Sequence, residues 1–62
     1  MRMVELDAVK GGKFWANPGQ IIYVTPNQKD QKHTDVQFAN GTTITVSDPA
    51  ADVTKKINTG LI

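Results

Sequence analysis

The sequence predicts a mainly β domain of the α+β class, with about five antiparallel strands and one C-terminal helix. Three observations predict it: apolar residues alternate along most of the chain, a Gly-Gly pair and an Asn-Gly pair mark hairpin turns, and an Asp-Pro pair marks a helix start. Such a sheet is also able to curl like a small barrel. A chain of 62 residues has room for one core, so we expect a single domain over residues 1–62.

The N-terminal half predicts three strands joined by two short turns. Residues 2–9 place apolar side chains at every second position, the period of a half-buried strand. Gly11 and Gly12 can form a two-residue hairpin turn, so the following KFWAN run should return antiparallel to the first strand. Asn17 can cap one helical turn in the NPGQ run, which leads into IIYVT as the third strand.

The C-terminal half predicts a loop, a hairpin and a helix. Residues 26–33, PNQKDQKH, contain no apolar residue, so we expect a solvated and mobile loop. The runs TDVQFA and TTITVS flank the Asn-Gly pair at 40–41, which is typical of a type I′ turn. Asp48 is the expected N-cap of the helix, Pro49 its first residue, and Gly60 its end.

The core is expected where the inward faces of these elements meet. Its predicted members are Val4, Leu6, Phe14, Ile22, Val24, Val36, Phe38, Ile44, Val46, Val53 and Ile57. The choice between Ile21 and Ile22 stays open by one register, because a one-residue slip exchanges the two faces of a strand. That slip would also change the face that Tyr23 occupies.

Composition indicates a soluble cytoplasmic protein that associates with itself. Seven Lys and Arg residues stand against six Asp and Glu residues and are scattered, so bulk charge predicts no polyanion partner. We expect neither a signal peptide nor a membrane span, because no positively charged segment leads into an apolar run and a span needs roughly 18 apolar residues. The chain has no cysteine for a disulfide, so a homo-oligomer is the expected supplement to a small core.

Two clusters of titratable residues are candidates for a catalytic or metal site. His33 lies near Asp30 and Asp35, but one imidazole in a polar loop offers too few metal ligands and has no nucleophile to activate. Glu5 and Asp7 share one face of the first strand, which we interpret as its solvated outer face. We therefore predict no catalytic residue, no metal or cofactor, and no enzymatic activity.

Trp15 is the candidate binding residue. Phe14 and Trp15 are consecutive on one strand, so if Phe14 points inward, Trp15 points outward. A tryptophan in so small a domain serves either in the core or at an interface, and both positions stay open. If Trp15 is exposed, Lys13 and Arg2 could join it and Tyr23, on a neighbouring strand, in one aromatic and basic binding patch.

Nearly the whole chain resembles the FlbD-like flagellar small proteins, also called SwrD, and related short phage and prophage proteins of unassigned function. The similar run is KFWANPGQIIYVTP…HTDVQFANGTTITVSDPAADVTKKI. The shared pattern consists of core and turn positions, namely Phe14, Asn17, Ile21 or Ile22, Val24, Val36, Asn40, Gly41, Ile44, Val46, Val53 and Ile57. The resemblance implies a shared fold, and it supplies no catalytic residues. This chain departs from the flagellar members in its longer polar loop at 26–33 and in Trp15.

Two functions from different classes follow. The leading hypothesis is a non-enzymatic protein-interaction module, a phage or bacterial accessory protein that binds a host or assembly partner through exposed strand edges. The alternative is a nucleic-acid-binding protein that uses the sheet face with Trp15 and Tyr23 to stack on bases.

Overall fold

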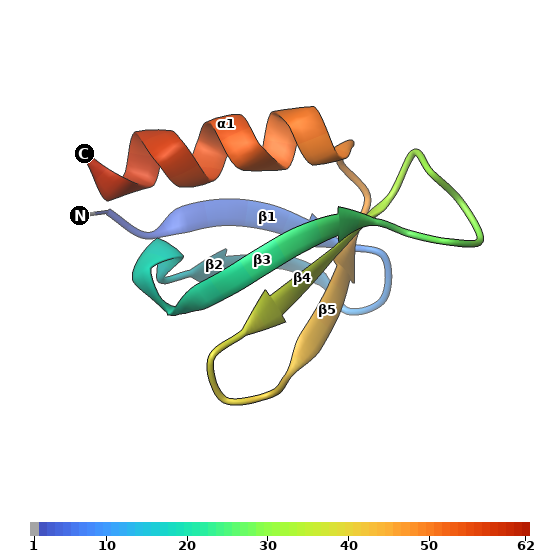
Figure 1. Ribbon diagram of the computed structural model, residues 1–62, viewed down its shortest axis with the longest axis horizontal. Helices are drawn as coiled ribbons and strands as arrows, with labels where there is room; N and C mark the ends of the chain where they lie inside the picture. The colour runs from blue at the N-terminus through green and yellow to red at the C-terminus, as the bar shows by residue number, and fades with distance from the viewer. Residues whose placement is uncertain (1) are drawn as a thin grey trace.

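The computed structural model describes residues 2–62, which form one antiparallel sheet and one helix (Figure 1). The elements are β1 (Val4–Ala8), β2 (Gly12–Ala16), the 3-10 turn η1 (Pro18–Gln20), β3 (Ile21–Pro26), β4 (Thr34–Phe38), β5 (Thr43–Val46) and α1 (Ala50–Leu61). The strand order is β2-β1-β5-β4-β3, so among the described strands β2 and β3 stand at the two edges and the sheet is open. The predicted mainly β fold with one C-terminal helix is confirmed.

The core lies between the inner face of the sheet and α1. Its buried hydrophobic residues are Val4, Leu6, Ala16, Val36, Val46 and Val53. Partly buried residues pack around them, namely Phe14, Ile21, Val24, Phe38, Ile44 and Ile57. The helix contacts mainly β1, β3 and η1, and it lies along one side of the sheet, away from the β4–β5 turn (Figure 1).

The prediction that Ile22 belongs to the core is wrong. The register of β3 against β4 shifts between Ile21 and Tyr23, so Ile22 is the extra residue of an irregularity of the β-bulge kind. Ile21 packs on the core instead, and Ile22 is 59% exposed. The register that the sequence left open is therefore decided in favour of Ile21, while Tyr23 stays exposed.

Both predicted hairpins form, but each turn is longer than predicted. In the β1–β2 hairpin, Ala8 pairs with Gly12, so residues 9–11 form the turn in place of Gly11-Gly12 alone. In the β4–β5 hairpin, Gly41 has a φ of 91°, whereas Asn40 has no positive φ. A type I′ turn requires positive φ at both positions, so that assignment is wrong.

The start of α1 also differs from the prediction. Pro49, with φ −63° and ψ 155°, occupies the N-cap position, and among the described residues no side chain caps the helix. The Asp48 carboxylate instead accepts a hydrogen bond from Lys56 Nζ at 2.9 Å. Asp48, which the sequence predicted as the N-cap, therefore forms an ion pair with Lys56 further along α1 and does not cap the helix.

Gly60 does not end the helix, which continues to Leu61. Gly60 is buried, and a Cβ atom there would lie 2.5 Å from Val4 Cγ1 and 3.0 Å from the Arg2 carbonyl oxygen. The Arg2 N–H donates to the Gly60 carbonyl at 2.7 Å, which ties the N-terminal segment to the end of α1. The role of this glycine is therefore close approach and not termination.

Candidate binding surfaces

The structure separates the four residues predicted to form one aromatic and basic patch. Trp15 and Lys13 lie on β2, whereas Tyr23 lies on β3 at the opposite edge, with β1, β5 and β4 between them. Arg2 precedes β1 and is held beside the end of α1. The expectation that Tyr23 neighbours Trp15 is wrong, because the strand order is set by long-range pairing that local pattern does not reveal.

Two of these four residues are engaged within the molecule. Lys13 Nζ lies 3.0 Å from the Glu5 carboxylate, and Glu5 is also the cross-strand partner of Trp15. The hydrogen bond to Glu5 and the negative charges of Glu5 and Asp7 raise the pKa of Lys13. The Tyr23 hydroxyl donates to Gln37 Oε1 at 2.9 Å.

The sequence allowed Trp15 either in the core or at an exposed interface, and the structure leaves it exposed. Its side chain is 60% exposed, while Phe14 packs against the core from the other face of β2. The predicted opposition of Phe14 and Trp15 is thus confirmed. This exposure makes Trp15 available to a partner.

Trp15 and Phe14 line a hollow of about 360 Å³, which we call the aromatic cleft. It lies between β2 with η1 on one side and the β4–β5 hairpin on the other, and Phe38 and Ile44 complete its apolar wall. None of the described residues that line it carries a charged side chain. Phe14, Phe38 and Ile44 were predicted as core, and the half-burial that opens them to the cleft arises because α1 covers a different part of the sheet.

Amide side chains stand among the residues that line the aromatic cleft. Asn17 Oδ1 accepts a hydrogen bond from the Gly19 N–H at 2.9 Å, which fixes the start of η1. Asn40 Oδ1 accepts one from the Thr42 N–H at 2.9 Å in the β4–β5 turn. Each oxygen therefore serves the local backbone, and each amide NH₂ group can donate to a ligand.

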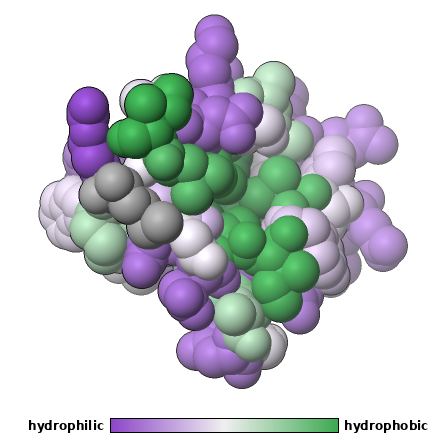
Figure 2. Space-filling view, turned by 60° about the vertical axis from the view of Figure 1, so that its left-hand side comes forward, coloured by the Kyte–Doolittle hydropathy of each residue, from purple (hydrophilic) through white to green (hydrophobic). Residues whose placement is uncertain are grey.

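A second surface, the apolar end, consists of Met3, Ile22, Leu61 and Ile62. All four side chains are exposed, with Ile62 at 89%. The two termini, η1 and the start of β3 lie at this end of the molecule (Figure 1), and hydrophobic residues form a band across it (Figure 2).

The apolar stripe of α1 leads onto this end. Val53, Ile57 and Leu61 are spaced by four residues and share one face of the helix. Val53 is fully buried, Ile57 is half-buried and Leu61 is 47% exposed. The stripe therefore extends past the sheet that covers its first part.

A charged cleft of about 670 Å³ is lined by residues of β1 and α1 and of the segments that precede them. Its residues include Glu5, Asp7, Asp48 and Lys56, and Lys56 Nζ lies 2.9 Å from Asp48. The hydrogen bond to Asp48, with the charges of Asp48, Asp7 and Glu5, raises the pKa of Lys56. Within residues 2–62, no three His, Cys, Asp or Glu residues are grouped to hold a metal ion. The residues that line this cleft include four acidic and three basic side chains, so most of its charges are balanced.

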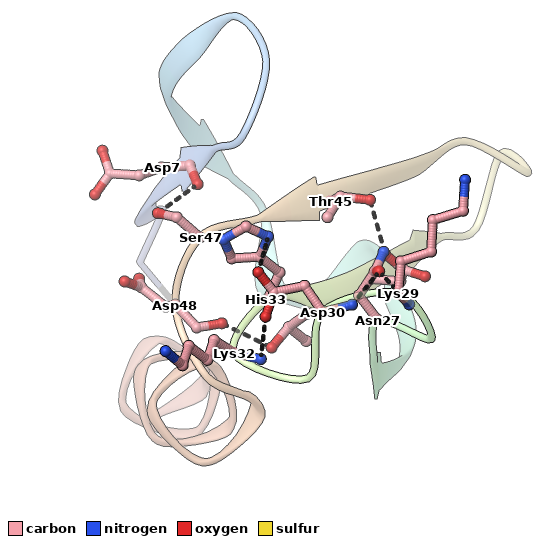
Figure 3. A network of polar contacts seen from close by, with 11 residues as sticks. Asp7, Asn27, Lys29, Asp30, Lys32, His33, Thr45, Ser47 and Asp48 are labelled. Atoms are coloured by element: carbon pink, nitrogen blue, oxygen red, sulfur yellow. Dashed lines mark hydrogen bonds and ion pairs between the residues drawn. The ribbon is translucent and has the colours of Figure 1, made fainter.

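The polar loop over residues 27–33 closes on itself (Figure 3). Asn27 Oδ1 accepts from the backbone N–H groups of Lys29 and Asp30, at 2.9 and 3.1 Å. Asp30 Oδ1 accepts from the Lys32 N–H at 3.0 Å, and Asp30 Oδ2 lies 3.6 Å from His33 Nδ1. The solvated loop is thus polar as predicted, and it is built from three-residue side-chain-to-backbone turns.

Asp35 anchors this loop to the sheet. Its Oδ1 accepts hydrogen bonds from Asn27 Nδ2 at 2.9 Å and from the Thr45 hydroxyl at 2.7 Å. These two bonds, the one from Asn27 foremost, lower the pKa of Asp35. Of the two aspartates near His33 in the sequence, Asp30 is therefore its partner, and Asp35 binds Asn27 and Thr45 instead.

No protein-family model, curated protein or solved structure matches this chain. The resemblance to FlbD-like proteins accordingly stays a prediction. Within residues 2–62, no helix combines the length and the apolar character that crossing a membrane requires. The functional argument therefore depends on the surfaces described above.

Proposed function

We propose that this protein is a small non-enzymatic interaction module that associates with itself and binds another protein chain. The apolar end carries the proposal: Met3, Ile22, Leu61 and Ile62 are exposed together at one end of the molecule. Contiguous apolar surface on a soluble domain is typical of a protein-interaction site. The core between α1 and the sheet forms without these side chains, so only contact with a partner would bury them.

The occupant proposed for the apolar end is a second copy of the chain. A two-fold interface brings the same residues of both copies together, so the four uncharged side chains of the apolar end meet no like charge, although Arg2 lies near them beside the end of α1. The adjoining edge strand β3, with the sequence IIYVTP, likewise carries no charged side chain. Two such edges can pair as antiparallel strands, which would also supplement a small core.

In this proposal the protein acts in the cytoplasm as a phage or bacterial accessory protein, and its further partner is a host or assembly protein. The support is the resemblance to FlbD-like and prophage proteins, which covers the core and turn positions of nearly the whole chain.

The alternative function, binding of single-stranded nucleic acid, has less support. Stacking on Trp15 would bring phosphates toward Glu5, its cross-strand partner. Lys13 is already paired with Glu5, and Tyr23 lies on the far edge strand. Because phosphate contacts dominate nucleic-acid affinity, this arrangement disfavours binding. We expect labelled single-stranded DNA to show no salt-dependent quenching of Trp15 fluorescence.

Sedimentation equilibrium tests self-association directly. We expect a dimer at about 100 μM, and Ile22→Lys should weaken it at least about tenfold with an unchanged circular dichroism spectrum. Gln28→Lys places the same charge in the polar loop, at the other end of the molecule, and should leave the dimer intact (Figure 1). A monomer at that concentration, or an equally strong dimer in Ile22→Lys, would contradict the proposal.

A further inference from the structure

We propose that Asn40 is a site of spontaneous deamidation, at which water converts the side-chain amide to a carboxylate without an enzyme. Asn40 is followed by Gly41 in the turn between β4 and β5, and both residues are exposed at the tip of this hairpin (Figure 1). The inference does not depend on the apolar end, because it concerns the chemistry of the turn alone.

The reaction begins at the backbone nitrogen of Gly41. After losing its proton to hydroxide, this nitrogen attacks Cγ of Asn40. A bond from the nitrogen to Cγ forms, and the bond from Cγ to the side-chain NH₂ group breaks. The NH₂ group takes up a proton from water and leaves as ammonia, so a cyclic imide remains. Water then opens the imide at either carbonyl, which gives aspartate or isoaspartate without any oxidant or reductant.

Two features of the turn favour closure of the imide. The Thr42 N–H donates to Asn40 Oδ1 at 2.9 Å, and this oxygen gains negative charge as the nitrogen attacks. A hydrogen-bond donor placed at a developing oxyanion lowers the barrier to reaction. Gly41 has no side chain to crowd the imide, and a Cβ atom added there would meet nothing within 4 Å.

The backbone hydrogen bonds of the turn oppose the reaction. The Gly41 N–H donates to the Phe38 carbonyl at 3.0 Å, so the nitrogen is free to attack only when the turn opens locally. The Phe38 N–H donates to the Thr42 carbonyl at 2.8 Å and also closes the turn. An exposed turn opens at a lower free-energy cost than the core of a domain. The turn therefore slows the reaction and does not prevent it.

The other three asparagines of the chain lack this combination of features. Asn17 is followed by a proline, which has no N–H to lose. The side-chain amide of Asn27 is held at its oxygen by the polar loop and at its nitrogen by Asp35. Asn58 lies inside α1, where the next backbone N–H belongs to the helical hydrogen bonds. Asn40 should therefore react first.

Deamidation changes the end of the hairpin in two ways. A carboxylate at residue 40 brings a negative charge to the aromatic cleft, whose other described lining residues are uncharged. Isoaspartate also adds a CH₂ group to the main chain directly before Gly41, inside the turn that the backbone bonds of Phe38 close. The chain therefore carries a slow and irreversible change of charge and shape at this hairpin.

Peptide mapping of the folded chain after incubation in mildly alkaline buffer tests the inference. Trypsin cleaves after lysine and arginine, and it places Asn40 in the peptide over residues 33–55, Asn17 and Asn27 in 14–29, and Asn58 in 57–62. We expect the first peptide to be deamidated at least about tenfold faster than the other two, with fragment masses that locate the change at residue 40. Two products of equal mass should appear. The aspartate product coelutes with the same peptide from Asn40→Asp, and the isoaspartate product elutes separately.

Gly41→Asp is the matched variant, because aspartate tolerates a positive φ better than most residues while its side chain crowds the imide. Deamidation of Asn40 should be at least about tenfold slower in this variant, with an unchanged circular dichroism spectrum. If the variant does not fold, the comparison of peptides and the isoaspartate product test the inference in the natural chain alone. An equal rate in the folded variant, or deamidation of Asn27 or Asn58 as fast as that of Asn40, would overturn the inference. So would a product without isoaspartate, or an unreacted Asn40 in the folded chain after the urea-unfolded chain has reacted.

Discussion

The two ends of the molecule differ in whether their side chains find partners within the molecule. At the polar end, the loop over residues 27–33 satisfies its own backbone through Asn27 and Asp30 and is bound to the sheet through Asp35. At the apolar end, Ile22 and Ile62 are left exposed after the core has formed. The polar end needs nothing from outside, whereas the apolar end would gain from burial.

This difference between the two ends indicates which part of a small domain is available for an interface. Among the described residues, hydrogen bonds at its base join the polar loop to the sheet, so changes in the loop should have local effects. Gly60, which precedes Leu61 of the apolar end, is packed directly against Val4 and Arg2, so changes near this end reach both the fold and the proposed interface. Substitutions at the two ends should therefore differ in size as well as in kind.

Gly60→Ala should have the largest effect on stability. The new Cβ would lie 2.5 Å from Val4 Cγ1 and 3.0 Å from a backbone oxygen, so α1 must move away from β1. Such overpacking costs about 1–3 kcal/mol, and each kcal/mol lowers the Tm of a domain this small by about 4–8 °C. Thermal unfolding followed by circular dichroism measures it. An unchanged Tm would show that the helix end is not closely packed.

Shortening the polar loop should have a smaller effect. Replacing residues 28–32 with Asn-Gly retains Asn27, whose N–H donates to the His33 carbonyl and whose amide binds Asp35. Because loop-closure entropy changes slowly with length, the Tm should stay within a few degrees. A variant that also carries Asn27→Ala should melt lower than the shortened loop alone. Global unfolding of the shortened chain would mean that the loop packs on the core.

The pH dependence of Asp35 should be the smallest effect. Its pKa lies below the ordinary value of 3.8 because the carboxylate accepts bonds from Asn27 and Thr45. The ionised group therefore stabilises the fold above about pH 4, and this contribution is lost as the pH falls through the lowered pKa. Between pH 6 and pH 2.5, the urea midpoint should fall more for the natural chain than for Asp35→Asn. Equal falls would show that Asp35 does not contribute.

Local pattern was sufficient to predict most of the fold. Alternation located the strands, and the Asn-Gly and Gly-Gly pairs located both hairpins. The errors lie where a distant contact decides. Ile22 is exposed because the register of β3 against β4 shifts at this residue. Asp48 forms an ion pair with Lys56 and does not cap the helix. Gly60 lies inside the helix, where it packs closely against Val4 of β1.

The candidate sites were harder to predict from the sequence than the fold. The order of Phe14 and Trp15 correctly predicted opposite faces, because the strand period is local. The aromatic cleft joins β2 to Phe38 and Asn40, which lie more than twenty positions away in the chain, so only the topology reveals it. The predicted patch with Tyr23 failed for the same reason.

The contrast between the two ends is tested most directly by two-dimensional ¹H–¹⁵N NMR spectra recorded from about 20 μM to about 1 mM. Self-association through the apolar end predicts concentration-dependent shifts at Met3, Ile22, Leu61 and Ile62 and along β3, while residues 27–33 stay unchanged. Spectra that do not change with concentration, or shifts confined to the polar loop, would contradict the assignment of the apolar end as an interface.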